Sequence, residues 1–446
     1  MLTRRAFAAL SAIGAAALHA APAAAQSAKR AEVEALRRFA EATHPRGREA
    51  AADADWRARW EALAAEADGL SEGQYFVRTR RALGWFKDGH TAPLPFEFIG
   101  GPPAGSDFAL ALPLRARAFH DGAYVTAVAG AAMPLLGARI TRVGGMESGA
   151  LIRAIAEQWP GNDAWAHRWA GSHFSSPALL QGMGAVRQAS APITIEGERN
   201  GRRVRVQLTP GAPAQLQEFE RPRTPAEAWR AEAGFANFVR IEGGALYIGC
   251  AEMADLEGKS FLEFTRDCFA AMAARPLDRL VLDLRRNGGG NNYLPEALRK
   301  RILRSPFNRP GGLYILTSPF TFSAAQNPAT RLERDSFAIF AGEPTGGAPN
   351  HYGDAQPFAG AASGITSIVS TIPWFDSYPS DQRAWIMPDL PAPETFADWR
   401  AGRDGALEAA LAHVSAEEAD EATRARIFFF RRPSQEAPWR PFWREA

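Results

Sequence analysis

The stretch between Leu280 and Asn350 constrains the fold of this chain most strongly. It alternates short runs of Val, Ile, Leu and Phe with breaks rich in Gly, Ser, Thr and Pro, and segments with helical spacing follow the first two breaks. Strands that alternate with helices in this way indicate βαβ units and a parallel sheet. Loops at the carboxyl ends of such strands usually carry the chemistry of α/β proteins. The sequence therefore predicts an α/β core with a site in these loops.

Two of these loops hold candidate reactive groups. Ser323 lies where a predicted strand enters a predicted helix, so the free N–H groups of the helix start favour negative charge beside its hydroxyl. This position suits a nucleophile with an oxyanion hole, although a serine there also serves as a simple N-cap. Gly288, Gly289 and Gly290 either direct backbone N–H groups at an anion or form a plain tight turn.

Composition and motif spacing exclude several classes of protein. The 446 residues are 46% hydrophobic and 22% charged with a net charge of +2, so the concentrated basic face that nucleic-acid binding needs is not indicated. The glycine run fits neither common nucleotide-binding pattern, and no His or Cys spacing indicates a metal site, so we expect no cofactor and no metal. The neighbours of Ser323, Thr321 and Ala325, do not fit the G-x-S-x-G turn of the α/β-hydrolases.

Residues 1–25 predict an export signal. Arg4 and Arg5 precede a short Ala-rich apolar run, and the segment ends in small residues of the kind that a signal peptidase recognises. The paired arginines before Phe7 favour the twin-arginine route over an ordinary secretory signal. The apolar run is too short to span a membrane, so we expect a periplasmic or secreted protein that begins near Gln26.

The two cysteines, Cys250 and Cys268, fall in a predicted strand and in the helix after it. An exported protein can form a disulfide, and a strand can pack against the helix that follows it. Two buried, unpaired thiols are favoured, because spacing alone does not supply the geometry that a disulfide requires.

Composition and pattern divide the chain into segments. An apolar stripe of Trp56, Trp60 and Leu63 indicates helices that pack on the rest of the protein, and Asn200-Gly201 predicts a tight hairpin. The expected segments are the signal peptide (1–25), a helical layer (30–105), a strand-rich module (107–210), the α/β core (211–400) and a C-terminal helix with an aromatic and basic tail (401–446). The tail is interpreted as a strap on the body, with contact to a membrane surface as the alternative.

The helical layer ends in a polar turn that contains His90. A histidine in such a turn is commonly solvated or caps a helix, so its surroundings alone do not mark it as catalytic.

Short motifs in a fixed order resemble the tail-specific, or C-terminal processing, peptidases, which are the S41 serine peptidases. The motifs span most of residues 30–395, and the strand-rich module lies where that family carries a PDZ-like domain. The motifs are D-G-H-T at 88–91, L-D-L-R-R-N-G-G-G at 282–290, T-F-S-A-A at 321–325, G-E-P-T-G-G at 342–347 and P-D at 388–389. The resemblance implies a ClpP/crotonase-like core sheet with helices, a helical N-terminal layer and an inserted PDZ-like domain.

The resemblance also implies roles for residues. It makes Ser323 the nucleophile, with an oxyanion hole from the N–H groups of Ala324 and of Gly288 or Gly289. Ala348 stands where one branch of the family has a dyad lysine, so the branch similar to tricorn peptidase is favoured.

In that branch a histidine of the D-x-H-T turn is the base, which here is His90. Asp381 is the nearest acid before Pro388-Asp389, although the branch uses glutamate there and has a serine where this chain has Gly89. His351 is the alternative base, because it lies in the loop region of the lost lysine.

The sequence thus predicts an exported serine peptidase that hydrolyses peptide bonds, with preference for the C-terminal regions of proteins or peptides. Its PDZ-like module is expected to bind a peptide as an added strand. Two alternatives remain open: a binding protein on the same fold that holds a peptide or apolar ligand, and a hydrolase of esters or amides that uses the same serine. The expected partners are peptide or protein substrates, without nucleic acid and without a stable membrane span.

Overall fold

The computed structural model describes residues 22–413, except 95, 97–99 and 243. The predicted C-terminal tail and most of the predicted export signal lie outside these residues. The last residues of the signal, from Pro22, are part of the first described helix, α2 (Pro22–Thr43).

A six-stranded sheet forms the core that the sequence predicts. Its central strands carry almost continuous buried apolar side chains, as expected for parallel strands with helices on both faces. The strand order is β18-β13-β12-β11-β10-β9, and only β9 is antiparallel to its neighbour. The strands are β9 (Asn237–Glu242), β10 (Ala245–Cys250), β11 (Arg279–Asp283), β12 (Leu313–Thr317), β13 (Ile339–Gly342) and β18 (Leu390–Pro391).

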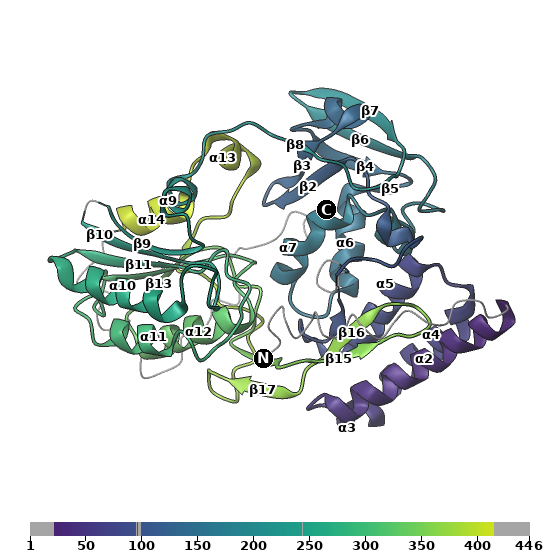
Figure 1. The fold of residues 1–446 in the computed structure, drawn as a ribbon, viewed down its shortest axis with the longest axis horizontal. Coiled ribbons are helices and arrows are strands. Elements are labelled where there is room, and N and C mark those ends of the chain that lie inside the picture. The colour runs from purple at the N-terminus through teal and green to yellow at the C-terminus, as the bar shows by residue number, and fades with distance from the viewer. Residues whose placement is uncertain (1–21, 95, 97–99, 243, 414–446) are drawn as a thin grey trace.

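Helices cover both faces of this sheet (Figure 1). One face packs against α10 (Phe261–Ala274), α11 (Glu296–Leu303) and α12 (Gln326–Asp335). The opposite face packs against α9 (Pro225–Ala233) and the predicted C-terminal helix, α14 (Gly405–Ala412). Cys250 and Cys268 lie buried and unpaired in the first of these cores, as expected, and burial raises the pKa of the Cys250 thiol to about 12.

The strand-rich module folds as a second sheet with its own apolar core. Its hairpin turns at Asn200 and Gly201, whose φ angles of 51° and 73° are those of the predicted tight turn. The strands are β2 (Leu114–Phe119), β3 (Gly122–Val128), β4 (Arg139–Val143), β5 (Met146–Glu147), β6 (Ile193–Arg199), β7 (Arg202–Leu208) and β8 (Gln217–Glu218), and the helices are α6 (Ser148–Gln158), α7 (Asp163–His173) and α8 (Pro177–Gly182).

The helical layer consists of α2, α3 (Gly47–Ala52), α4 (Ala54–Glu66) and α5 (Glu72–Leu83). Trp56, Trp60 and Leu63 are buried in its core, as the apolar stripe predicts. No described helix has the length and apolarity that crossing a membrane requires.

A segment from the α/β core completes the helical layer. Strands β15 (Gln356–Ala359) and β16 (Thr366–Val369) form a small sheet with β1 (Ala92–Pro93), directly after the turn that contains His90. The Glu32 carboxylate accepts hydrogen bonds from the N–H groups of Ala362 and Ser363, at 2.7 and 3.0 Å, and so ties this segment to α2.

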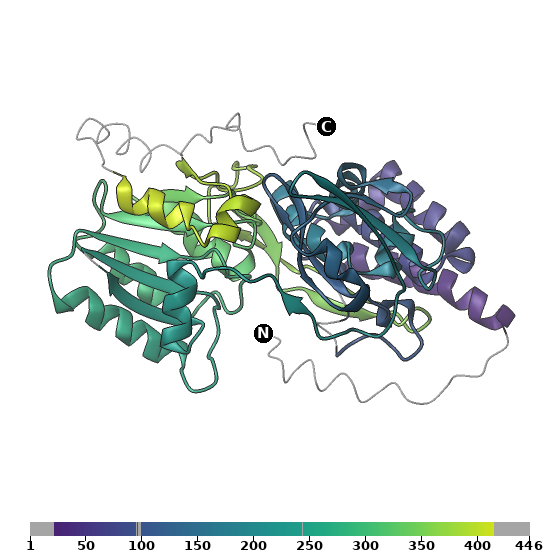
Figure 2. The same cartoon turned by 90° about the horizontal axis from the view of Figure 1, so that it is seen from above.

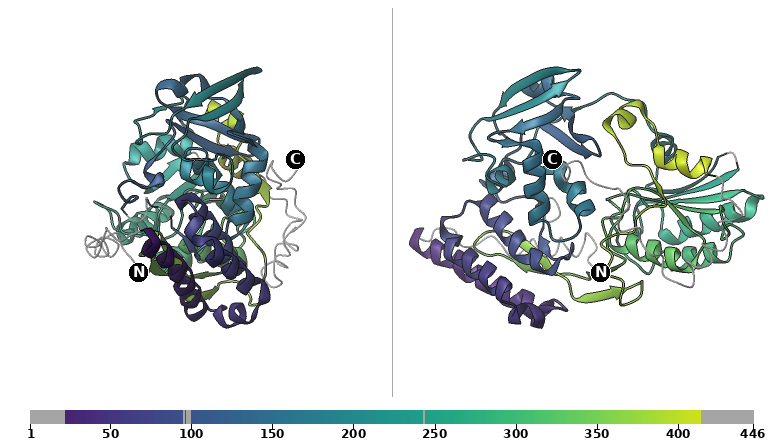
Figure 3. Two further views of the ribbon diagram at one scale, coloured as in Figure 1. Left: turned by 90° about the vertical axis from the view of Figure 1, so that its right-hand side faces the viewer. Right: turned by 180° about the vertical axis from the view of Figure 1, so that it is seen from behind.

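The molecule has two lobes connected by extended chain (Figure 2). One lobe is built on the six-stranded sheet, and the other combines the helical layer with the strand-rich module. A two-stranded ribbon of β14 (Asn350–Gly353) and β17 (Ile372–Phe375) runs between them at the base of the molecule (Figures 1 and 3). The segment that contains His90 belongs to one lobe and the segment that contains Ser323 to the other, and the two segments meet where the lobes join.

Candidate active site

Ser323 occupies the turn between β12 and α12 in an unusual backbone conformation. Its φ is +53°, in the left-handed region that residues other than glycine rarely adopt. Such a conformation costs about 1–3 kcal/mol and persists only where the surrounding structure enforces it. Two bonds to the neighbouring strand turn do so: the Thr321 hydroxyl donates to the Leu284 carbonyl at 3.0 Å, and the Phe322 N–H donates to the Asn287 carbonyl at 3.2 Å.

The glycine loop lies directly against this serine. Gly289 has a φ of +115°, and a Cβ at this residue would come within 2.6 Å of the Ser323 Cβ and 2.9 Å of the Ala324 nitrogen. Only glycine fits such an approach. The structure therefore brings together Ser323, Ala324 and the glycine loop, three parts of the site predicted from sequence.

The backbone N–H groups next to Ser323 differ in whether they already donate a hydrogen bond. The Gly289 N–H donates to the side-chain oxygen of Asn287 at 2.9 Å, and that buried amide in turn donates to the Cys250 carbonyl at 3.0 Å. Among the described residues, the N–H groups of Ala324 and Gly288 have no recorded hydrogen bond. These two are the donors available to an oxyanion in this arrangement.

His90 lies beside the residue that precedes Ser323. Its ring stacks on the Phe322 ring with centroids 4.3 Å apart, and its Nδ1 is 3.8 Å from Oδ1 of Asp88. The side chain is 14% exposed, and within the described part of the chain its buried Nε2 has no hydrogen-bond partner. His90 is thus next to Ser323 in the fold, without a hydrogen bond to it.

Asp88 is the carboxylate beside His90. It is 3% exposed and accepts hydrogen bonds from the Thr91 and Ser370 hydroxyls, both at 2.6 Å, and from the His90 N–H at 3.0 Å. Burial acts to raise the pKa of Asp88, but interactions with His44, His90 and Ser370 outweigh it and hold the pKa well below its usual range. Asp88 is therefore ionised near neutral pH.

His351, the alternative base, lies on β14 and faces the same region. Its ring centroid is 5.9 Å from that of His90, and its Nδ1 is 3.2 Å from the carbonyl of Ala348. A Nδ1–H that donates to this carbonyl leaves Nε2 unprotonated. Burial, and then the charge of His90, lower the pKa of His351 to about 4, so it is neutral near pH 7.

Asp381 has partners of its own. Its carboxylate accepts bonds from the Arg383 guanidinium at 2.8–3.0 Å and from the Ser377 hydroxyl at 2.6 Å, and Arg383 also pairs with Glu333 at 2.8 Å. No contact between Asp381 and His90 is recorded among the described residues. The sequence points to Asp381 as the acid for His90, whereas the structure places Asp88 at that position.

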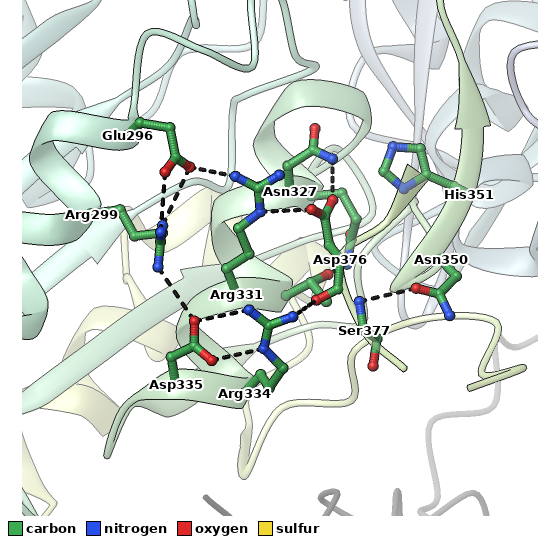
Figure 4. Close-up of polar contacts among 12 residues, drawn as sticks. Glu296, Arg299, Asn327, Arg331, Arg334, Asp335, Asn350, His351, Asp376 and Ser377 are labelled. Atoms are coloured by element: carbon green, nitrogen blue, oxygen red, sulfur yellow. Dashed lines mark hydrogen bonds and ion pairs between the residues drawn. The ribbon is translucent and has the colours of Figure 1, made fainter. Parts of the chain in front are cut away.

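Ion pairs fix α12, which follows Ser323, to the chain after β17 (Figure 4). The Arg331 Nε donates to Oδ1 of Asp376 at 2.6 Å, and the same arginine pairs with Glu296 of α11 at 2.5 Å. Asn327, one turn beyond Ser323, also donates to Asp376. The N–H of Ser377, next to Asp376, donates to the side-chain oxygen of Asn350 at 3.0 Å, and Asn350 precedes His351 on β14, so this network connects the helix of the serine with the ribbon of the histidine.

An aromatic stack joins the strand-rich module to the serine turn. Trp165 of α7 lies parallel to Phe322, with centroids 3.9 Å apart and an interplanar angle of 7°. The Phe322 ring is thus held between Trp165 and His90. In addition, no group of His, Cys, Asp and Glu in the described ranges is arranged to hold a metal ion.

No protein-family model and no curated protein matches the chain. Among solved structures, mature CPAF superposes with a TM-score of 0.58 at 12% identity, covering 86% of this chain and 96% of that one. The complex of mature CPAF with lactacystin gives a TM-score of 0.56 at 12% identity, over 91% and 99% of the two chains. The chain has the fold of CPAF. The photosystem II D1 C-terminal processing protease matches at a TM-score of 0.39 and 13% identity, over 82% of this chain and 93% of that one.

The CPAF-like fold confirms the α/β architecture expected from the sequence. The contacts in this structure also bring residues to the candidate site that the sequence did not indicate. Asp88 lies within the D-G-H-T motif, and its spacing to His90 is a local signal that points to a paired carboxylate. His44 and Trp165 reach the site only through packing between distant segments. Phe322 is adjacent to the predicted nucleophile, but its stacking partners are set by tertiary structure.

Proposed function

We propose that the protein is a serine peptidase in which Ser323 is the nucleophile and His90 the base. The observation that carries this proposal is the left-handed backbone of Ser323 beside Gly289. Strain of this kind gathers at functional sites, and here it occurs at a half-buried serine that adjoins backbone N–H groups without hydrogen-bond partners among the described residues. The CPAF-like fold and the order of the S41-like motifs support the assignment.

In this mechanism the Ser323 Oγ attacks the carbonyl carbon of a peptide bond while Nε2 of His90 takes its proton. The N–H groups of Ala324 and Gly288 stabilise the oxyanion. The resulting imidazolium gives its proton to the departing amine as the C–N bond breaks, which leaves an acyl group on Ser323. Water then attacks the acyl-enzyme with His90 again as base, which releases the second product and restores the serine.

Asp88 is the acidic partner in this scheme. Its Oδ1 faces Nδ1 of His90, so it keeps a proton on that nitrogen and leaves Nε2 as the acceptor. The negative charge of Asp88 also stabilises the imidazolium that forms during the reaction.

The substrate is proposed from the same resemblance, and the location from the first residues of the chain. The strand-rich module is proposed to be PDZ-like and to bind the C-terminal end of a peptide as an added strand, which directs cleavage to C-terminal regions. The residues at the start of the chain support export by the twin-arginine route to the periplasm or beyond.

Labelling with a fluorophosphonate, followed by assay on fluorogenic peptides, tests the assignment. Wild-type protein is expected to be labelled, while Ser323→Ala is expected to lose labelling and at least a thousandfold in kcat. Ser190→Ala, which changes an exposed serine, is the matched control and should behave as wild type. Full activity in Ser323→Ala rules out this nucleophile.

The choice of base is tested in the same assay. His90→Gln should abolish labelling, because the glutamine amide cannot take the proton of Ser323. His351→Gln should reduce it only severalfold, because the Nδ1 of His351 faces a neutral carbonyl. The reverse result assigns the base to His351.

One observation favours a second function, that of a binding protein on the same fold. The Nε2 of His90 has no hydrogen-bond partner among the described residues, and its ring is packed on Phe322 instead of being bonded to Ser323. A protein that binds peptides with micromolar affinity but is not labelled at Ser323 has this function. Labelling at Ser323 together with turnover of small esters but not of peptides identifies an ester or amide hydrolase instead.

A further inference from the structure

A second histidine lies on the far side of Asp88 and is not used by the proposed mechanism. His44 follows the end of α2 and is 4% exposed. Its Nε2 lies 3.5 Å from Oδ2 of Asp88. Its ring stacks on Phe86 at a centroid distance of 3.8 Å and lies 4.7 Å from the ring of Tyr352. The imidazole is therefore held in one orientation from two sides.

A backbone donor fixes the tautomer of His44. The N–H of Arg46 donates to Nδ1 of His44 at 3.0 Å, so that nitrogen carries a lone pair and no proton. The neutral ring then has its proton on Nε2, which faces Asp88. This buried Nε2 has no hydrogen-bond partner among the described residues, because the contact with Asp88 lies at the limit of a hydrogen bond.

The two oxygens of Asp88 have different surroundings. Oδ1 faces His90, with the backbone nitrogen at 3.0 Å and Nδ1 at 3.8 Å. Oδ2 accepts from the hydroxyls of Thr91 and Ser370, both at 2.6 Å, and faces His44. Oδ2 thus already accepts two hydrogen bonds, and the Nε2 of His44, at 3.5 Å, adds a longer third contact on that side. His44 is the imidazole that stands there.

Other titratable groups near this pair leave Asp88 as the dominant charge. Glu49 interacts electrostatically with His44, but its carboxylate forms an ion pair with Arg46 at 2.5 Å. Tyr352, whose pKa is raised by burial, and His351, whose pKa is lowered to about 4, are both neutral near pH 7. Among the described residues, His90 and His44 are thus the two imidazoles that face the Asp88 carboxylate.

We propose that His44 is a positioning residue for the reaction at Ser323: its Nε2–H donates to Asp88 and holds the carboxylate in the orientation that His90 requires. The inference rests on the peptidase function proposed above. When His90 takes the proton of Ser323, it becomes an imidazolium, and the Asp88 carboxylate must keep its orientation to stabilise that charge. A donor on its second oxygen opposes that rotation and withdraws part of its negative charge from His90.

Three substitutions separate the features of His44. His44→Gln places an amide N–H close to the position of Nε2 and so keeps the donor to Asp88. His44→Asn keeps an acceptor for the Arg46 N–H but loses that donor. His44→Phe keeps the stacking on Phe86 and loses both polar functions. Thermal melting of each variant identifies any that fails to fold.

The expected kinetic result is a loss in kcat without a matching change in KM, because His44 acts through Asp88 and not on the substrate. His44→Asn and His44→Phe should lose roughly tenfold or more in kcat. The acid limb of their pH profile should move to higher pH, since a carboxylate without this donor holds the His90 proton more tightly. His44→Gln should recover most of kcat and the original acid limb.

A titration that needs no turnover separates this inference from the proposed function. The imidazole signals of His90 are followed by NMR against pH in Ser323→Ala and in Ser323→Ala combined with His44→Asn or His44→Gln. The His90 midpoint is expected to rise by several tenths of a pH unit with Asn and to return with Gln. An unchanged midpoint together with an unchanged kcat overturns the role of His44. A shifted midpoint in a protein that hydrolyses no substrate keeps the coupling and rejects the peptidase.

Discussion

The ring of His90 lies against the ring of Phe322, with centroids 4.3 Å apart and 23° between their planes. Phe322 immediately precedes the candidate nucleophile, and Trp165 covers its other face. The stack therefore places His90, the proposed base, beside the serine, and in this arrangement His90 makes no hydrogen bond with the hydroxyl.

Phe322→Leu tests whether the stack restrains His90. An aromatic pair contributes about 0.5–1.5 kcal/mol beyond the area it buries, and leucine keeps an apolar side chain in this buried position. We expect Phe322→Leu to lower the melting temperature and to raise the rate of fluorophosphonate labelling severalfold. Trp165→Leu, which exposes the opposite face of Phe322, is the control for loss of packing alone. A slower labelling rate in Phe322→Leu shows instead that the ring orients the base.

Gly289→Ala tests the approach of the glycine loop to the serine. The added Cβ would lie 2.6 Å from the Ser323 Cβ at a backbone φ of +115°. We expect destabilisation of about 1–3 kcal/mol and loss of fluorophosphonate labelling. Gly201→Ala is the matched control, because that residue also has a positive φ, of +73°, but no atom within 4 Å of its added Cβ. Gly201→Ala should lose stability and keep labelling; equal labelling of the two variants contradicts the assigned oxyanion loop.

Asp88→Asn and Asp381→Asn separate the two candidate acids. Asp88→Asn removes the charge beside His90 and is expected to lower kcat by a hundredfold or more. Asp381→Asn leaves Arg383 with one carboxylate, Glu333, in a buried cluster. It should mainly lower the free energy of unfolding, by a few kcal/mol, and with it the melting temperature. The measurements are kcat per folded molecule and thermal unfolding. A larger loss of kcat in Asp381→Asn restores the assignment made from sequence.

Acid should destabilise the folded protein through its buried histidines. Burial, and then the charge of His90, lower the pKa of His351 to about 4, below the ordinary value near 6.5. The unfolded chain therefore binds this proton first, so the stability contributed by neutral His351 is present above about pH 6.5 and is lost as the pH falls toward 4. Between these two pH limits, His351 changes the free energy of unfolding by an amount on the order of 3 kcal/mol.

Melting temperatures measured between pH 7 and pH 4.5 test this dependence. His351→Gln should lose less stability than wild type over that range. Part of the loss should remain, because burial also lowers the pKa of His167 to about 4 and that of His173 to about 3. Identical slopes for wild type and His351→Gln contradict a neutral, partly buried His351.

Local sequence patterns were sufficient to predict the α/β core and the turn that contains Ser323. The buried runs of β10, β11 and β12 show in the sequence because parallel strands are covered on both faces. Ser323 and the glycine loop were predicted because both follow such strands directly. The tight hairpin at Asn200 was predictable for a similar reason, since its turn chemistry is contained in adjacent residues.

The partners of His90 were not predictable in this way. Asp381 was chosen because it precedes the Pro388-Asp389 motif, but Arg383, two residues along, satisfies its carboxylate. His44 is separated from Asp88 by the three α-helices α3, α4 and α5, and only the packing of the helical layer brings their side chains together. Contacts of this kind depend on tertiary structure, which no local spacing specifies.

The pairing of β16 with β1 has a consequence for biosynthesis. During translation, His90 leaves the ribosome first and Ser323 much later, and β16, which pairs with β1 just after the turn that contains His90, comes later still. Its neighbour Ser370 then donates to Asp88. A nascent chain that already contains both candidate residues thus lacks this pairing and the Ser370 contact with Asp88, so the candidate site is complete only after residue 370 has been made.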